Sequence, residues 1–333
     1  MTCSIFSGLF LLFAVSQPVD GTPAPKTPIV YTTDLYHPHD DPDDHYDLAT
    51  LFAMPEFDIR AIVIDCGERG KERPGIPAIK QMEKLTGRQV PYAVGLTANL
   101  RDLDDDGTSQ PAEDQKGVEL ILSVLRDSDK PVTIFATGSM RDVAAAYNRA
   151  PDLFRTKLGR IYMNAGNTNG KDIEWNVSLD VNSYRRILES GLPIYWVPCF
   201  GTETRQSFWV FRQSDVLDRV RPELQQFFIY ALDKTPVVDD GPVKALTAPI
   251  RSEAKSKWWP QERNMWCTAA FLDAAGRKGK TFDFAPAMFR LEPDGKTALV
   301  TEGGMSVPTI RILDPKGYAE EMKSVLQSLL SSL

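Results

Sequence analysis

The segment Ile29–Gly67, IVYTTDLYHPHDDPDDHYDLATLFAMPEFDIRAIVIDCG, decides how this chain folds. It opens with a short β-like run over 29–33 and ends with a second apolar run over 59–65. The stretch between them, 44–54, has helical character, so the segment predicts a strand–helix–strand unit with parallel strands. The second run is apolar at most positions, which is typical of a strand buried on both faces of a sheet.

The same alternation continues along the chain. Further strands are expected over 90–94, 132–137, 161–164 and 194–198, and further helices over 76–85, 115–126, 141–148 and 182–189. This pattern predicts an α/β fold with a mostly parallel, doubly wound sheet that helices cover on both faces. Late strands over 297–301 and 309–313 and a helix over 317–330 predict a short C-terminal β/α extension. Ligands in such folds bind at the carboxyl ends of the strands.

The composition and the N-terminus narrow the class of protein. The 333 residues hold 38 Lys and Arg against 45 Asp and Glu, and the net charge of −7 argues against nucleic-acid binding. An apolar run over 4–15 leads into Ala14-Val15-Ser16, the small-x-small pattern of a cleavage site. We therefore expect a signal peptide over 1–16, a proline-rich linker over 17–28, one domain over 29–333, and a secreted or periplasmic protein. No later stretch is apolar enough to cross a membrane.

Residues 34–45 contain five aspartates and all three histidines of the chain, directly after the first strand. Clustered carboxylates repel one another unless a cation or a proton compensates their charge, and hard oxygen ligands favour Ca²⁺ or Mg²⁺. The segment therefore predicts a metal-dependent site. A solvated acidic loop is the simpler alternative. A second alternative is a different metal-dependent hydrolase, because His37, His39 and His45 are imidazole ligands that suit a transition metal.

Several motifs in order resemble the nucleoside hydrolase family of the inosine–uridine-preferring type. Asp34 and the pair Asp43-Asp44 are similar to the family's first-strand Asp and the Asp-Asp pair that opens a helix. The segments 43–67, 131–143 (PVTIFATGSMRDV) and 190–198 (SGLPIYWVP) follow its layout, as does 314–330. Glu174-Trp175-Asn176 followed by Asp180 resembles its "E-F-N-x-x-x-D" motif. The resemblance covers most of residues 29–330.

The resemblance implies a calcium-dependent hydrolase that cleaves the N-glycosidic bond of a ribonucleoside or related glycoside. It also implies a homo-oligomer. The implied calcium ligands are Asp34, Asp44 and the backbone carbonyl of Thr137, and Asp43 is the implied general base that activates water. The residues implied to contact substrate are Glu174 and Asn176 at the ribose hydroxyls, and Asn167 or Asn169 at the 5′ side.

Three departures from the family pattern affect the expected site. Eight residues (35–42) separate Asp34 from Asp43, more than the family has there, and they include two histidines. The family's late His-Asp pair, which supplies a leaving-group contact and a calcium carboxylate, is absent. We expect Asn264-Met265 in its place, with Asn264 offering an amide oxygen, and Glu68 stands where the family usually has Asn. We expect both Asn264 and Glu68 to contact the substrate. Because of these changes, a non-catalytic carbohydrate- or nucleoside-binding protein with the same fold is an alternative interpretation.

Two further features bear on the site. The run Asp102–Glu113 satisfies the ligand positions of an EF-hand loop, although an acidic solvated loop over the mouth of the site is the favoured interpretation. Cys66, Cys199 and Cys267 follow the expected leader, and without a C-x-x-C pair they predict no structural zinc site.

Overall fold

The computed structural model describes residues 25–65 and 67–333. The expected signal peptide, most of the expected linker and Cys66 lie outside the described residues. The first strand, β1 (Thr27–Thr33), takes the last two residues of the expected linker into the sheet.

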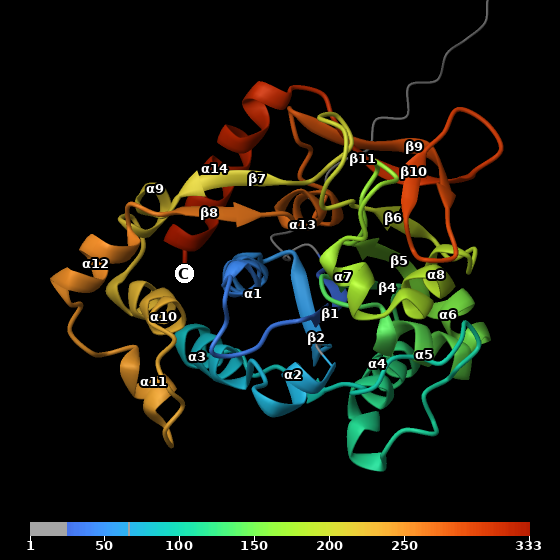
Figure 1. The fold of residues 1–333 in the computed structure, drawn as a ribbon. Coiled ribbons are helices and arrows are strands. Elements are labelled where there is room, and N and C mark those ends of the chain that lie inside the picture. The colour runs from blue at the N-terminus through green and yellow to red at the C-terminus, as the bar shows by residue number, and fades with distance from the viewer. Residues whose placement is uncertain (1–24, 66) are drawn as a thin grey trace, which may run out of the picture.

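A nine-stranded sheet runs through the centre of the molecule (Figure 1). Its strands lie in the order β10-β9-β11-β6-β5-β4-β1-β2-β3. The bounds after β1 are β2 (Phe57–Ile64), β3 (Tyr92–Val94), β4 (Val132–Ala136), β5 (Leu158–Met163), β6 (Ile194–Trp196), β9 (Phe282–Leu291), β10 (Thr297–Leu299) and β11 (Met305–Ile312). Seven neighbouring strands, in the spatial order β11-β6-β5-β4-β1-β2-β3, pair in parallel. β9 runs in the opposite direction and pairs antiparallel with β11 and β10. The prediction of a mostly parallel sheet is therefore confirmed.

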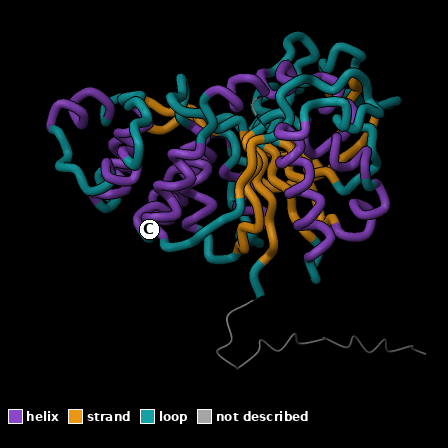
Figure 2. The backbone as a smooth tube through the Cα atoms, turned by 90° about the horizontal axis from the view of Figure 1, so that it is seen from below, coloured by secondary structure: helices purple, strands orange, loops and turns teal. Residues whose placement is uncertain are grey.

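Helices pack against both faces of this sheet, as Figure 2 shows. One core holds side chains of α1 (Asp43–Ala53), α3 (Ile76–Thr86), α10 (Pro222–Leu232), α13 (Thr268–Ala274) and α14 (Pro315–Ser331). The other holds side chains of α4 (Lys116–Asp127), α5 (Arg141–Arg149), α6 (Pro151–Lys157) and α8 (Val181–Leu188). Along β1, Ile29 and Tyr31 enter the first core and Val30 enters the second, because successive strand residues point to opposite faces.

The part of the chain after residue 200 is richer in structure than its sequence pattern predicts. β7 (Trp209–Arg212) and β8 (Glu262–Met265) form a separate antiparallel pair, and α9 (Gln213–Leu217), α10, α11 (Gly241–Ala245) and α12 (Ser252–Trp258) lie between them in the chain. We expected two late strands in the C-terminal extension and find three, since β9 was missed. Among the described residues, no helix is long and apolar enough to span a bilayer.

The strand order places a topological switch point between β1 and β4. From β1 the chain moves outward through β2 and β3, and then returns to β4 on the other side of β1. The loops that leave β1 and β4 therefore diverge at the carboxyl edge of the sheet, which is where ligands bind in doubly wound folds. Asp34 follows β1 directly and Thr137 follows β4 directly.

Candidate active site

A cavity of about 410 Å³ opens at this edge of the sheet. Its walls come from the loops after β1, β4, β5 and β6, the first turn of α1, and the loop between β8 and α13. The lining residues are Asp34, Tyr36, His39, Asp40, Asp41, Asp43, Asp44, Asp47, Arg69, Thr137, Asn164, Glu174, Trp175, Asn176, Cys199, Phe200, Trp266 and Cys267. The structure thus brings Asp34, Asp43, Asp44, Thr137, Glu174 and Asn176 into one cavity, as their sequence motifs predict.

Three of the six aspartates that line the cavity carry the sequence prediction, and they differ in how they are held. Asp34 is buried, and its Oδ2 accepts a hydrogen bond from the indole N–H of Trp175 at 3.0 Å. Asp44 is also buried, and its Oδ1 accepts a bond from the Thr33 hydroxyl at 2.5 Å. Asp43 is half-buried at the first position of α1. The N-terminus of a helix favours carboxylates in its first turn, which helps to place two acidic side chains here.

Burial and mutual repulsion leave this cluster with uncompensated charge. Burial raises the pKa of the Asp34 carboxyl well above its ordinary value, and the neighbouring Asp44 raises it further. The pKa of Asp43 is raised for the same two reasons. Carboxylates in this situation either hold protons or bind a cation, and a bound cation would lower their pKa values.

Glu174 and Asn176 are fixed by hydrogen bonds to the backbone. Glu174 caps α7 (Trp175–Leu179), and its two oxygens accept the backbone N–H groups of Gly166 at 2.8 Å and Asn176 at 3.0 Å. The Asn176 amide nitrogen donates to the carbonyls of Thr137 at 3.2 Å and Asn164 at 2.8 Å. Burial raises the pKa of Glu174 to about 6, although the backbone donors lower it in part. Both side chains therefore face the cavity in a single orientation.

Asn164 is a site residue that our site prediction missed. It directly follows β5, is fully buried, and lines the cavity. Neither amide atom of its side chain has a hydrogen-bond partner in the described structure. A buried amide without partners loses free energy unless a ligand or water supplies them. Its position directly after a strand of the parallel sheet was the available signal.

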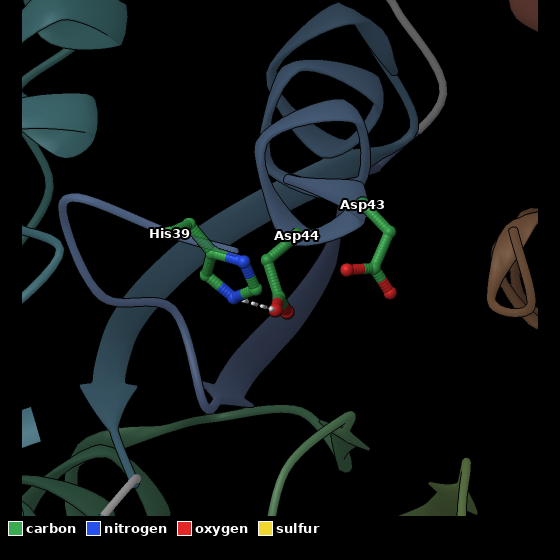
Figure 3. A group of neighbouring side chains, drawn as sticks. All are labelled: His39, Asp43 and Asp44. Carbon is green, nitrogen blue, oxygen red and sulfur yellow. Dashed lines mark ion pairs between the residues drawn. The ribbon is translucent and has the colours of Figure 1, made fainter. Parts of the chain in front are cut away.

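The three histidine rings lie close together, with centroids 6.3 Å apart for His37 and His45 and 6.1 Å apart for His39 and His45, but only one of them lines the cavity. His37 directs Nε2 to the carbonyl of Thr235 at 2.7 Å, and its ring stacks on Tyr230. His45 is buried against Phe227 and is not part of the cavity wall. Only His39 lies with the acidic pair. One nitrogen of His39 and one oxygen each of Asp43 and Asp44 lie within 4.8 Å of one another. Figure 3 shows the three side chains.

Four predicted substrate contacts lie away from the cavity. Asn264 is exposed on β8, and Glu68 is exposed on α2 (Gly67–Glu72). Asn167 is buried, but its side chain accepts the backbone N–H of Asn169 at 3.0 Å, while Asn169 is exposed and closes a turn with Lys171. The structure therefore corrects these assignments, because local turns and strand direction point the side chains elsewhere.

The late segment reaches the cavity two residues beyond the predicted position. Trp266 and Cys267 line the wall, whereas Met265 is buried in β8, where it pairs with Trp209 of β7. The Trp266 ring lies 5.9 Å from Phe200 and forms an aromatic face, and its indole N–H has no partner within the described residues. The Cys267 thiol donates to Asp47. An aromatic ring and a thiol thus stand near the place where we expected a carboxylate or an amide.

The acidic loop over 102–113 does not cover the cavity. None of its residues lines the cavity wall, and it packs instead against α5, where Asn148 donates to the carbonyls of Leu103 and Asp105. Its carboxylates close local turns, and Asp105 pairs with Arg101 at 2.7 Å. The expectation of a loop over the mouth is therefore wrong.

A doubly wound α/β fold with an acidic, partly aromatic cavity at its switch point defines a protein of the nucleoside hydrolase class. The model of the family described as inosine-uridine preferring nucleoside hydrolase matches residues 34–257. The chain belongs to this family.

Individual relatives agree with this assignment. The chain is 30% identical over 187 residues to the pyrimidine-specific ribonucleoside hydrolase RihA of Enterobacter sp. (strain 638), covering 50% of this chain and 58% of that protein. The chain therefore spans little more than half the length of this relative. Among solved structures, a plant nucleoside hydrolase has a TM-score of 0.59 at 18% identity, covering 91% of this chain and 100% of that one. An inosine-guanosine nucleoside hydrolase has a TM-score of 0.58 at 16% identity, covering 91% and 98%.

Proposed function

We propose that this protein is a calcium-dependent hydrolase that cleaves the N-glycosidic bond of a ribonucleoside or a related glycoside. The observation that carries the proposal is the convergence of Asp34, Asp43 and Asp44 on one cavity that also presents Glu174 and Asn176. A volume of about 410 Å³ suits a small molecule of nucleoside size. Membership of the family supports glycosidic bond hydrolysis as the reaction.

Calcium fits the donors at the acidic end. Asp34 and Asp44 offer carboxylate oxygens and Thr137 a backbone carbonyl oxygen, and these are the hard ligands that Ca²⁺ prefers. The raised pKa values of Asp34 and Asp43 also favour a cation, because it would offset the repulsion between the carboxylates. When bound, the ion lowers the pKa of a water molecule and orients it.

Asp43 is the group best placed to accept the proton of the attacking water. Among the described residues, no hydrogen bond or ion pair engages its side chain, whereas Asp34 and Asp44 each have a donor. The oxygen of the attacking water forms a bond to the anomeric carbon of the sugar. The bond between that carbon and the nitrogen of the nucleobase breaks, and the electron pair of this bond leaves with the nucleobase. The neighbouring carboxylates stabilise the positive charge that develops on the sugar ring.

The remaining walls position the two halves of the substrate. Glu174, Asn176 and Asn164 present hydrogen-bonding groups, which suit sugar hydroxyls. Phe200 and Trp266 present aromatic faces, on which a planar base stacks. Because the polar groups are held by backbone contacts or buried at strand ends, little reorganisation is needed when a ligand binds.

The test is base release from a panel of purine and pyrimidine ribonucleosides, followed by chromatography, with and without a calcium chelator. We expect release that the chelator abolishes and that Asp43→Asn lowers at least about 100-fold. Arg155→Met, a change in an exposed ion pair far from the cavity, is the matched control for handling and stability. Equal turnover by Asp43→Asn and the wild type would remove the mechanism.

A non-catalytic binding protein is the second candidate, and one observation favours it. Cys267 stands at the wall where the resemblance predicts a late metal carboxylate, so a ligand of the expected ion is missing. Tight binding of a nucleoside or sugar in calorimetry, without turnover by the folded calcium-loaded protein, would favour this candidate.

We also propose export, on the basis of the apolar run over 4–15 and the Ala14-Val15-Ser16 pattern. N-terminal sequencing of the protein recovered outside the cytoplasm should begin after about residue 16. Recovery of full-length protein from the cytoplasm alone would contradict the proposal. Homo-oligomer formation stays a prediction, which the molar mass from light scattering checks.

A further inference from the structure

The segment 35–42, which lengthens the connection between β1 and α1, is anchored on both sides. The backbone N–H of His37 donates to the carbonyl of Arg73 at 3.0 Å, next to α2. Asp40 pairs with Lys234 at 2.7 Å beyond the end of α10, and Asp41 pairs with Arg263 on β8. These contacts fix the course of the segment across the acidic end of the cavity.

His39 is the residue that this anchoring places in the cavity. Its ring packs on Tyr36, with centroids 4.1 Å apart, and only 7% of the residue is exposed. Its Nε2 is buried, has no hydrogen-bond partner among the described residues, and faces Asp44 Oδ2 at 3.5 Å (Figure 3). A separation of 3.5 Å is too long for a good N–H···O bond, so the donor position is left for another acceptor.

The other ring nitrogen determines the state of the imidazole. Nδ1 of His39 accepts the backbone N–H of Asp41 at 2.8 Å. A nitrogen that accepts a hydrogen bond carries a lone pair and no proton, so the proton of the neutral ring is on Nε2. A protonated Nε2 donates a hydrogen bond and cannot ligate a metal ion through the same atom.

We propose that His39 is a hydrogen-bond donor to the substrate, with Nε2–H directed at a sugar oxygen bound beside Asp44, and is not a ligand of the cation. The acceptor is a sugar oxygen because the carboxylates next to His39 form the polar end of the cavity. Phe200 and Trp266, whose faces suit a planar base, pack against each other with ring centroids 5.9 Å apart. The inference rests on the proposed function for the identity of the ligand. It also implies that the cation at this site takes oxygen ligands.

Three substitutions at one position separate a donor from a metal ligand. His39→Gln places an amide N–H near the position of Nε2, His39→Glu places a metal-binding oxygen there, and His39→Ala removes the group. We expect kcat/KM within about threefold of the wild type for His39→Gln and about a tenfold loss for the other two, as for one hydrogen bond to a ligand. Calcium affinity, from titration calorimetry, should change less than about threefold in His39→Gln and His39→Ala.

Other results would overturn the proposal. If His39→Glu keeps activity and calcium affinity while His39→Gln loses both, His39 is a metal ligand. If all three variants match the wild type, His39 does not contact the substrate. His37→Gln is the matched control, because its imidazole points to Thr235 and away from the cavity. Thermal unfolding of each variant shows whether a loss reflects the fold.

Failure of the proposed function is recognised separately. If the wild type hydrolyses no nucleoside, the same variants are compared for the binding of ribose and of nucleosides by calorimetry. Weaker binding by His39→Ala and retained binding by His39→Gln would then support the donor while refuting hydrolysis. Absence of binding to the folded, calcium-loaded wild type would overturn both proposals.

Discussion

Replacing Asp43 by Asn should make the cation-free protein more stable while it removes activity. Asp43 has no hydrogen bond or ion pair to lose among the described residues, and it lies beside Asp44 and near Asp34. Its negative charge is therefore a cost to the fold unless a cation is present, and the isosteric amide removes that cost.

The expected gain follows from the distance. Oxygens of Asp43 and Asp44 lie within 4.8 Å of each other. Two unit charges at that distance repel by about 3 kcal/mol at an effective dielectric constant of about 20. With an unfolding entropy of about 2.1 cal/mol/K per residue over roughly 300 residues, this free energy corresponds to a rise in Tm of about 5 °C.

The assay measures the Tm of the wild type and of Asp43→Asn by calorimetry, in the presence of a calcium chelator and over a range of pH. A carboxyl pKa that is raised in the folded state means that the folded state binds the proton more tightly than the unfolded state. The cation-free wild type should therefore lose stability as the pH rises above about 4, the ordinary range of an aspartate. The advantage of Asp43→Asn should be smallest near pH 5 and largest near pH 9.

Two results would refute this reasoning. A lower Tm for Asp43→Asn than for the wild type at pH 9 would mean that the carboxylate stabilises the fold. A gain that does not vary with pH would mean that charge is not its cause. Asp152→Asn is the control, because it removes the charge of an exposed ion pair with Arg155 outside the cavity, and it should give no gain.

Three further predictions concern the surroundings of the site. Arg141→Met should lower the free energy of unfolding, measured in urea titrations, by about 3–5 kcal/mol, because it leaves the buried carboxylate of Asp180 without its ion-pair partner. Arg155→Met, at an exposed ion pair, should lower it by less than about 1 kcal/mol. Asn164→Ala should raise KM by about fivefold and leave Tm unchanged, since its amide atoms have no partner in the described structure; an unchanged KM would remove it from the sugar site. Asp44→Asn should weaken calcium binding in calorimetry by about tenfold or more, and unchanged affinity would place the ion elsewhere.

The predicted site residues that line the cavity lie after parallel strands or at the starts of helices. Asp34 directly follows β1 and Thr137 directly follows β4, and a parallel sheet brings the ends of its strands to one edge. Asp43 and Asp44 follow from the start of a helix, which is also a local signal. Glu174 is placed by its own capping of α7. For these residues, local pattern and topology are sufficient.

The misplaced residues depend on contacts that no local pattern contains. Asn264 lies on β8, whose partner β7 is about 50 residues earlier, and this pairing decides that Met265 is buried and that Trp266 reaches the cavity.

The strand β9 was missed because Pro286 interrupts its strand pattern. It is tolerated because β10 pairs only with Phe289–Leu291 and leaves the backbone at Pro286 unpaired on that side.

The anchoring of segment 35–42 has a consequence for how this protein can be changed. The segment joins the carboxyl end of β1 to the region of α10 through Thr235 and Lys234, and to β8 through Arg263. A graft that exchanges the helices between β7 and β8, for example to alter the leaving group, would remove the contacts that aim the His39 imidazole. The two regions must therefore be transplanted together, and natural substitutions at one should be accompanied by substitutions at the other.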